Sequence, residues 1–209
     1  MPRPSRWNDV VDAAAKVFQE RGFAAASLED IAFEVGMRKG SLYHYINSKE
    51  NLLFAVASEP AARILDELQR VSGLDLPPSE KLRQATLTHA TVLDETFVYA
   101  SVYLREIAGN QRFTEWAARD RDYRLLLTSI VRQGIARGDF APNINAGTTT
   151  LAFIGSLNWM THWYRPGGPL PASVIADQIC STFLNGLISR GPHPSPSGGP
   201  ARPRKLAGK

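Results

Sequence analysis

Cysteine is nearly absent from the 209 residues, because Cys180 stands alone. A single cysteine excludes an internal disulfide and is typical of proteins kept in a reducing compartment. Apolar runs are short as well, and none approaches the ~18 residues that a membrane helix needs. Asp9 and Asp12 stand where a secretory signal would have its apolar stretch. We therefore expect a cytoplasmic protein that does not contact a membrane.

The motifs of common catalytic and metal sites are also missing. The sequence has no glycine-rich phosphate loop, no Cys/His spacing of a zinc site and no helical Glu-x-x-His pair. His89 falls on an apolar helix, where a satisfied core residue is the expected interpretation. We therefore expect no catalytic site, no metal and no cofactor, and we do not expect an enzyme.

Positive charge is unevenly placed along the chain, whose net charge is +4. Residues 1–55 hold seven charges of each sign, and residues 56–189 hold twelve cations and thirteen acids. Residues 190–209 hold five cations and no acid, so the positive excess lies in the tail. The tail is rich in Pro, Gly and Ser, and we expect it to be disordered. A DNA-binding surface must then depend on where charges lie in the folded part, not on their sum.

Apolar periodicity predicts an all-α protein of about nine helices. Apolar residues recur at helical spacing before the tail, and no segment shows the alternation of a strand. We divide the chain into a helix-turn-helix domain at 1–48, a helical ligand-binding and dimerisation domain at 49–190 and a basic tail at 191–209. The expected helices lie at about 5–21, 27–35, 38–45, 49–71, 79–95, 97–108, 112–137, 145–164 and 171–189.

The short helix expected at 38–45 carries a polar surface without acids. If Leu42 and Ile46 pack inward, the outward side chains are those of Arg38, Lys39, Ser41, Tyr43 and His44. Gly40 lets the backbone approach another surface closely. Ser27 and Lys49 stand at helix starts, where main-chain N–H groups favour phosphate. Two short helices joined by a glycine turn are typical of a helix-turn-helix, whose second helix enters the major groove of DNA. The alternative is an ordinary solvated helix.

Residues 22–53, GFAAASLEDIAFEVGMRKGSLYHYINSKENLL, resemble the DNA-binding signature of the TetR family of bacterial transcriptional regulators. The resemblance implies phosphate contacts from Ser27, Tyr43 and Lys49. It implies contacts to base edges or phosphates from Arg38, Lys39, Ser41 and His44, beside Gly40. Tyr45 replaces a histidine of the family pattern and is a further candidate for a phosphate contact.

The same resemblance implies an effector pocket and a homodimer built by the helices at about 145–164 and 171–189. The first of these helices carries small residues that permit close approach of another helix, namely Gly147, Ala152, Gly155 and Ser156. The second has a long apolar face, which could also be internal core. A two-fold dimer suits the two half-sites of a double-stranded operator. The implied function is that of a repressor released from its operator by a small molecule.

Aromatic and arginine side chains gather between about 97 and 165. QGIARGDFAPNI at 133–144 and HWYRPGGPLP at 162–171 are similar to stretches of TetR-type regulators that respond to acyl-CoA thioesters. An apolar slot with arginines suits the acyl chain and the phosphates of such an effector. The candidate ligand-binding residues are Tyr99, Tyr103, Arg105, Trp116, Tyr123, Arg124, Trp159, His162, Trp163 and Arg165.

These features have plainer alternatives. An aromatic cluster can be ordinary core, and the alternating charges at 119–124 are typical of a solvated, self-paired face. The segment 163–168 can be a structural turn between two helices. At the level of function, the alternatives are a regulator of a different hydrophobic ligand of the drug-efflux type, an all-helical acyl-CoA-binding enzyme, and a TetR-like protein without DNA binding.

Overall fold

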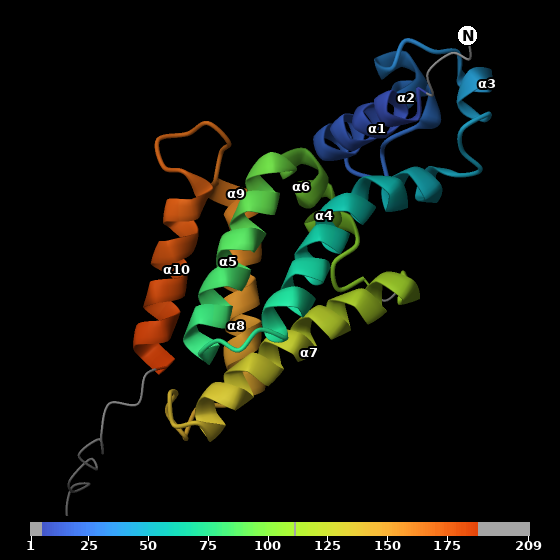
Figure 1. The fold of residues 1–209 in the computed structure, drawn as a ribbon. Coiled ribbons are helices and arrows are strands. Elements are labelled where there is room, and N and C mark those ends of the chain that lie inside the picture. Colours follow the sequence, from blue (N-terminus) through green and yellow to red (C-terminus); the bar gives the residue numbers. More distant parts are fainter. Residues whose placement is uncertain (1–5, 111, 188–209) are drawn as a thin grey trace, which may run out of the picture.

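The computed structural model describes residues 6–110 and 112–187. All the regular elements in these ranges are helices, as the sequence predicts, and they form a small head (α1–α3) and a larger body (α4–α10) (Figure 1). Within the described residues the elements are α1 Trp7–Arg21, α2 Leu28–Glu34, α3 Lys39–Leu42, α4 Lys49–Ser72, α5 Pro78–Glu95, α6 Phe97–Glu106, α7 Thr114–Ala136, α8 Ala146–Asn158, α9 Met160–Trp163 and α10 Ala172–Leu187. The predicted tail lies outside the described residues.

Local sequence explains the geometry of the head. The Ser27 hydroxyl accepts the main-chain N–H of Asp30, whose carboxylate accepts the N–H of Ser27, so α2 begins with a capping box. The Ser27 hydroxyl also donates to the Asp30 carboxylate at 2.7 Å, and this bond and the main-chain N–H bond lower the pKa of Asp30. Gly36 then turns the chain with φ at +66°, a conformation that favours glycine. The helix expected at 38–45 is shorter than predicted, because main-chain bonds from His44 to Ser41 and from Tyr45 to Leu42 close tight turns after α3.

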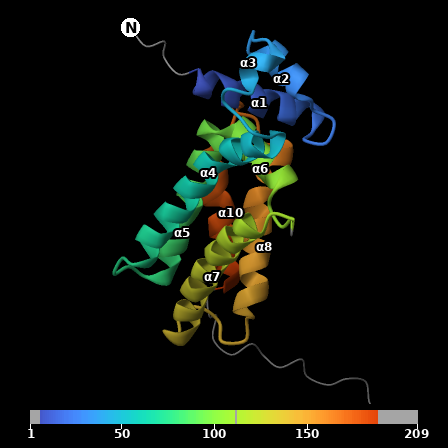
Figure 2. The ribbon, with the colours of Figure 1, turned by 90° about the vertical axis from the view of Figure 1, so that its right-hand side faces the viewer.

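The core of the head does not stop at the predicted boundary at residue 48. Val10, Phe18 and Leu42 of the head belong to one buried cluster with the first half of α4, with part of α6 and with Trp116 of α7. A second cluster joins the end of α4 to α5, α7, α8 and α10. The two cores therefore separate within α4, and the head rests directly on α4 and α6 at one end of the body (Figure 2).

The body differs from the prediction at one helix. The helix expected at 145–164 is divided at Trp159 into α8 and the single turn α9. A loop from Tyr164 to Pro171 follows, and α10 then packs against α5 and α8. In the described part of the chain, no helix combines the length and the hydropathy needed to cross a bilayer.

Candidate functional site

The outer surface of the head has the exposed polar side chains that the sequence predicts. Arg38, Lys39, Gly40, Ser41, Tyr43 and His44 are all exposed, whereas Leu42 and Ile46 are buried beneath them. Tyr45 is half-buried and packs against the core of the head. Because α3 is only one turn long, the surface consists of that turn and the tight turns after it. We call it the α3 surface (residues 38–45).

Ion pairs leave one cation of the α3 surface free. Lys39 donates to Glu29 of α2. Lys16 and Arg21 of α1, and Arg6 just before it, also form ion pairs with carboxylates. In the described head, the Arg38 side chain has no hydrogen-bond or ion-pair partner. Its guanidinium is therefore available to a phosphate or to the acceptors of a guanine.

The Lys49 ammonium is bonded within the protein and is not free for a phosphate as the resemblance implies. Its ammonium lies 2.7 Å from the main-chain oxygens of Phe23 and Ala26, and it lies 4.5 Å from the centroid of the Phe23 ring. A weaker bond of 3.5 Å reaches Ala24. An ammonium has three donors, so these oxygens occupy all of them. Lys49 thus ties the start of α4 to the loop before α2.

A cavity of about 770 Å³ lies in the body, between α4, α5, α6, α7 and the α8–α9 region. Its volume falls in the range of small-molecule sites. Apolar side chains of several helices line it, including Ile64, Leu65, Leu93, Leu104 and Ile154. Arg105, Arg119 and Arg124 line it as well, so the cavity offers an apolar interior and a cationic region.

Six of the ten candidate ligand-binding residues line this cavity, namely Tyr103, Arg105, Tyr123, Arg124, Trp159 and His162. Trp159 and His162 stack with ring centroids 3.8 Å apart and an interplanar angle of 14°, and both are exposed. The cavity also includes Arg119, Asp120 and His89, which the candidate set omits. His89 is buried, as expected for a core histidine, yet it also faces the cavity.

The structure places the other four candidates outside the cavity. Trp116 is buried in the shared core, where it stacks with Phe54 and lies 5.0 Å from the Arg119 guanidinium. Tyr99 donates to Asp12 of the head. Trp163 is exposed and Arg165 donates to the main-chain oxygen of Tyr164. Aromatic composition cannot separate these roles, because helix packing decides which face each ring occupies.

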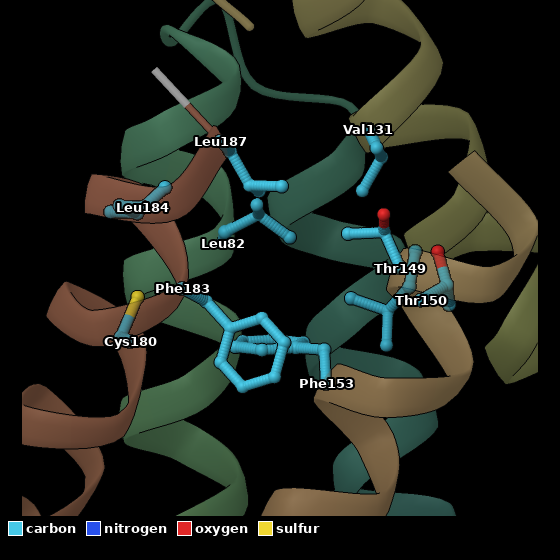
Figure 3. A pocket seen from close by; sticks show the side chains of 10 residues that line it. Leu82, Val131, Thr149, Thr150, Phe153, Cys180, Phe183, Leu184 and Leu187 are labelled. Atoms are coloured by element: carbon cyan, nitrogen blue, oxygen red, sulfur yellow. The ribbon is translucent and has the colours of Figure 1, made fainter. Parts of the chain in front are cut away.

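A second hollow between α5, α7, α8 and α10 is too small for an effector (Figure 3). Its volume is about 10 Å³, which is room for about one water. Phe153 and Phe183 meet edge to face beside it with centroids 5.1 Å apart, and the Thr150 hydroxyl donates to a main-chain oxygen. It is a packing gap in the second core cluster.

One cavity residue also contacts the head. Arg105 of α6 donates to the main-chain oxygens of Phe18 and Gln19 in the last turn of α1, the second at 3.0 Å. Its Nε lies 2.8 Å from a carboxylate oxygen of Glu106, and the same oxygen accepts the main-chain N–H of Phe23 at 3.1 Å. A cation near the C-terminus of α1 also suits the helix dipole. The cavity wall and the head–body contact therefore share one guanidinium.

Exposed large apolar side chains occur at α8, α9 and the start of α10. Leu151, Trp159, Trp163, Leu170 and Val174 are each about half or more exposed. Ala152 and Gly155 lie among them on the exposed side of α8. Contiguous exposed apolar surface of this kind is typical of an interface. We call it the α8–α10 surface (residues 151–174).

Comparison with known proteins agrees with this geometry. Residues 10–56 match the model of bacterial regulatory proteins of the tetR family, and residues 75–187 match the tetracyclin repressor-like C-terminal domain. The HTH-type transcriptional repressor KstR2 of Mycobacterium tuberculosis H37Rv is 31% identical over 199 residues, which cover 90% of this chain and 95% of that protein. KstR2 of Rhodococcus jostii RHA1 is 27% identical, covering 91% and 94%.

Solved structures give the same result. The structure of the ketosteroid transcriptional regulator KstR2 of M. tuberculosis superposes with a TM-score of 0.82 at 25% identity, covering 90% of this chain and 97% of that one. AibR in complex with isovaleryl coenzyme A and operator DNA shares the fold, with a TM-score of 0.72 at 24% identity and coverage of 88% and 98%. The chain therefore belongs to the TetR family of bacterial transcriptional regulators, whose members are DNA-binding regulators and not enzymes.

Proposed function

We propose that this protein is a homodimeric repressor that binds operator DNA through the α3 surface and leaves it when an anionic, largely apolar effector fills the 770 Å³ cavity. Its relatives named KstR2 are transcriptional repressors, which supports the direction of regulation. An acyl-CoA thioester is the effector class that the cavity favours. The protein acts where operator DNA lies, in the cytoplasm.

The DNA contacts follow from the exposed groups of the α3 surface. Arg38 is the first candidate for a base contact, because no carboxylate holds it. Lys39 reaches DNA only by leaving Glu29, and Ser41, Tyr43 and His44 supply hydroxyl and imidazole donors to phosphates beside Gly40. Tyr45 is the half-buried end of this surface, Ser27 caps the start of α2, and Lys49 holds the loop before α2.

The chemistry of the cavity matches the two halves of an acyl-CoA. The side chains of Ile64, Leu65 and Leu104 suit an acyl group. Arg105, Arg119 and Arg124 suit phosphate oxygens, which accept charge-assisted hydrogen bonds from guanidinium groups. The exposed stack of Trp159 and His162 offers a flat aromatic surface to a nucleotide base. AibR, which shares the fold, was solved with isovaleryl coenzyme A and operator DNA together.

The Arg105 guanidinium both lines the cavity and bonds to α1, which supports the proposal that the protein responds to a ligand. An anion in the cavity competes with the neutral carbonyls of Phe18 and Gln19 for Arg105, and charge-assisted bonds are the stronger ones. When Arg105 turns to the effector, α1 loses two of its hydrogen bonds to α6, while the bond from Tyr99 to Asp12 remains. The head can then move relative to the body, which changes the separation of the two α3 surfaces in a dimer.

The α8–α10 surface is the proposed interface of the homodimer. Its exposed apolar side chains are covered if two copies pack there about a two-fold axis. Ala152 and Gly155 permit the close approach of a partner helix. Two α3 surfaces about one helical turn of DNA apart, roughly 34–36 Å, or a multiple of it, would then meet successive major grooves.

The test combines effector and DNA binding. Thermal unfolding is measured with a panel of acyl-CoAs, free CoA and free fatty acids, and DNA binding is measured on the fragment upstream of the protein's own coding region. We expect a thioester to raise the unfolding temperature and to weaken DNA binding, since a ligand stabilises the state it binds. Linkage requires that DNA weaken binding of the same thioester by an equal factor. Stabilisation only by uncharged hydrophobic drugs would favour the efflux-type alternative.

A further inference from the structure

One polar pair in the cavity wall joins α5 to α7, one turn after Arg119 on α7. His89 of α5 is only 4% exposed, and its Nδ1 lies 3.3 Å from the phenol oxygen of Tyr123 of α7. Both residues line the cavity beside apolar side chains such as Leu93 and Ile154. When a ligand removes such a pair from water, the loss costs free energy unless the ligand accepts the remaining hydrogen.

Counting hydrogens shows that the pair has a donor to spare. Burial lowers the pKa of His89 to about 4 and raises the pKa of Tyr123, so both are neutral near pH 7. A neutral imidazole has one N–H and the phenol has one O–H. One of these two hydrogens lies between Nδ1 and the phenol oxygen. Whichever tautomer is present, the other hydrogen remains, and among the described residues neither side chain has a second hydrogen-bond partner.

Three hydroxyl-bearing side chains of the wall are already committed. Tyr103 donates its O–H to Asp120. Ser101 donates to the main-chain oxygen of Phe97 at 2.7 Å. Thr161 donates to the main-chain oxygen of Asn158 at 2.9 Å. All three line the cavity, yet their hydrogens are used within the protein. The spare donor of the His89–Tyr123 pair is therefore directed to whatever occupies the cavity.

We infer that His89 and Tyr123 together bind an oxygen acceptor on the apolar part of the effector, so that the protein selects a keto- or hydroxyl-bearing acyl group over a plain hydrocarbon chain. This inference rests on the proposed function for the identity of the cavity as the effector site. The physical reason is that the two kinds of ligand affect the spare donor differently. An oxygenated ligand satisfies the spare donor, whereas a plain chain removes it from water and leaves it unpaired.

The test uses dodecanoyl-CoA, its analogues with one keto or hydroxyl group at successive chain positions, and the matching free acids. Affinities are measured by calorimetry for the wild type and for the double variant His89→Leu/Tyr123→Phe. Both residues are changed because either one alone keeps a hydrogen for the ligand. We expect at least one oxygenated thioester to bind the wild type about tenfold more tightly than dodecanoyl-CoA. The double variant should bind the two about equally.

Ser101→Ala is the control, because it removes a hydroxyl from the same wall whose hydrogen is held by the main-chain oxygen of Phe97. It should leave the preference for oxygen unchanged. The wild-type comparison stands even if the double variant does not fold, since a wild type without any preference for oxygen overturns the inference.

The outcomes separate this inference from the proposed function. Thioesters that bind without a preference for oxygen, or with one that survives in the double variant, overturn the inference alone. If only oxygenated free acids bind, and the double variant loses them, the CoA effector is wrong and the inference stands. If neither panel binds, both are overturned.

Discussion

Arg105 of α6 donates from Nη1 to the main-chain oxygen of Gln19, 3.0 Å away in the last turn of α1. The two residues are 86 positions apart in sequence, and the bond joins the wall of the cavity proposed for the effector to the head. Glu106 strengthens the same junction by accepting the main-chain N–H of Phe23. A ligand that binds Arg105 therefore acts directly on the contact that orients the α3 surface.

Replacing Arg105 by Met should uncouple effector binding from DNA binding. The variant keeps an unbranched apolar stem but has no donor for Phe18, Gln19 or an effector phosphate. We expect effector affinity to fall about tenfold, in line with the loss of one charge-assisted contact. We also expect the factor by which effector weakens DNA binding to shrink towards one. Fluorescence anisotropy with labelled operator, with and without effector, measures both.

Arg121→Met is the control for this experiment. Arg121 is exposed on α7, lies outside the cavity, and its ion pair with Asp122 is long at 4.0 Å. It should leave effector affinity and coupling as in the wild type. Equal coupling in the Arg105 and Arg121 variants would show that the head senses the effector by another route.

Arg38 and Lys49 should differ in the salt dependence of DNA binding. Arg38 is exposed and free, so Arg38→Met should lower the slope of log K against log salt by about 0.9 if it meets a phosphate. Lys49 has its donors on main-chain oxygens, so Lys49→Met should leave the slope unchanged and lower the unfolding temperature. Filter binding from 50 to 200 mM salt and thermal unfolding give the two readouts. A slope reduced by Lys49→Met would place its ammonium on DNA.

The α8–α10 surface can be tested with two leucines of similar exposure. Leu151 of α8 is 57% exposed and Leu125 of α7 is 53% exposed. Leu151 also lines the cavity, so the variants are compared without effector. Leu151→Glu places a charge within the proposed interface and should give a monomer that binds operator weakly, because it loses the second half-site. Leu125→Glu should remain a dimer. Sedimentation analysis at micromolar concentration distinguishes them, and a dimeric Leu151→Glu would locate the interface elsewhere.

His89 should make stability depend on acidic pH. Its folded pKa of about 4 lies below the ordinary value of about 6.5, so the unfolded chain binds the proton more readily. The contribution of the neutral His89 imidazole to the free energy of unfolding is fully present above pH 6.5 and is lost as the pH falls towards 4. Between pH 7.5 and 5 the loss should be about 2 kcal/mol. Glutamine does not titrate, so the free energy of unfolding of His89→Gln, measured with urea, should fall by about 2 kcal/mol less over this pH range. An equal loss in both proteins would contradict the buried neutral imidazole.

Gly134 of α7 is needed for packing against Phe140. A Cβ at position 134 would lie 2.2 Å from a ring carbon of Phe140, which is fully buried. Gly134→Ala should therefore destabilise the protein by about 1–3 kcal/mol, although alanine is the better helix former. Gly186→Ala in α10 meets nothing within 4 Å and should not destabilise. Chemical denaturation of both variants decides, and a stabilised Gly134→Ala would show that the ring can move aside.

Local patterns in the sequence were sufficient to predict the helices of the head. The capping box of Ser27 and Asp30 and the turn at Gly36 depend on residues close in sequence, so they can be recognised without a fold. The exposed groups of the α3 surface follow in the same way from Leu42 and Ile46. The internal bonds of Lys49 were not predictable, because they depend on carbonyls brought together by folding. The short length of α3 was missed because tight turns with bonds three residues apart continue the spacing of a helix.

The sequence by itself determined the all-helical class, the helix-turn-helix and its polar surface, because these depend on the 3.6-residue period and on short-range capping. Only the tertiary structure decided which aromatic and charged side chains share the cavity. It placed Trp116 in a core, turned Tyr99 towards Asp12 and brought His89 to Tyr123 across 34 positions. Those relationships depend on how α5, α6 and α7 pack, and contacts between distant helices leave no periodic signal in the chain.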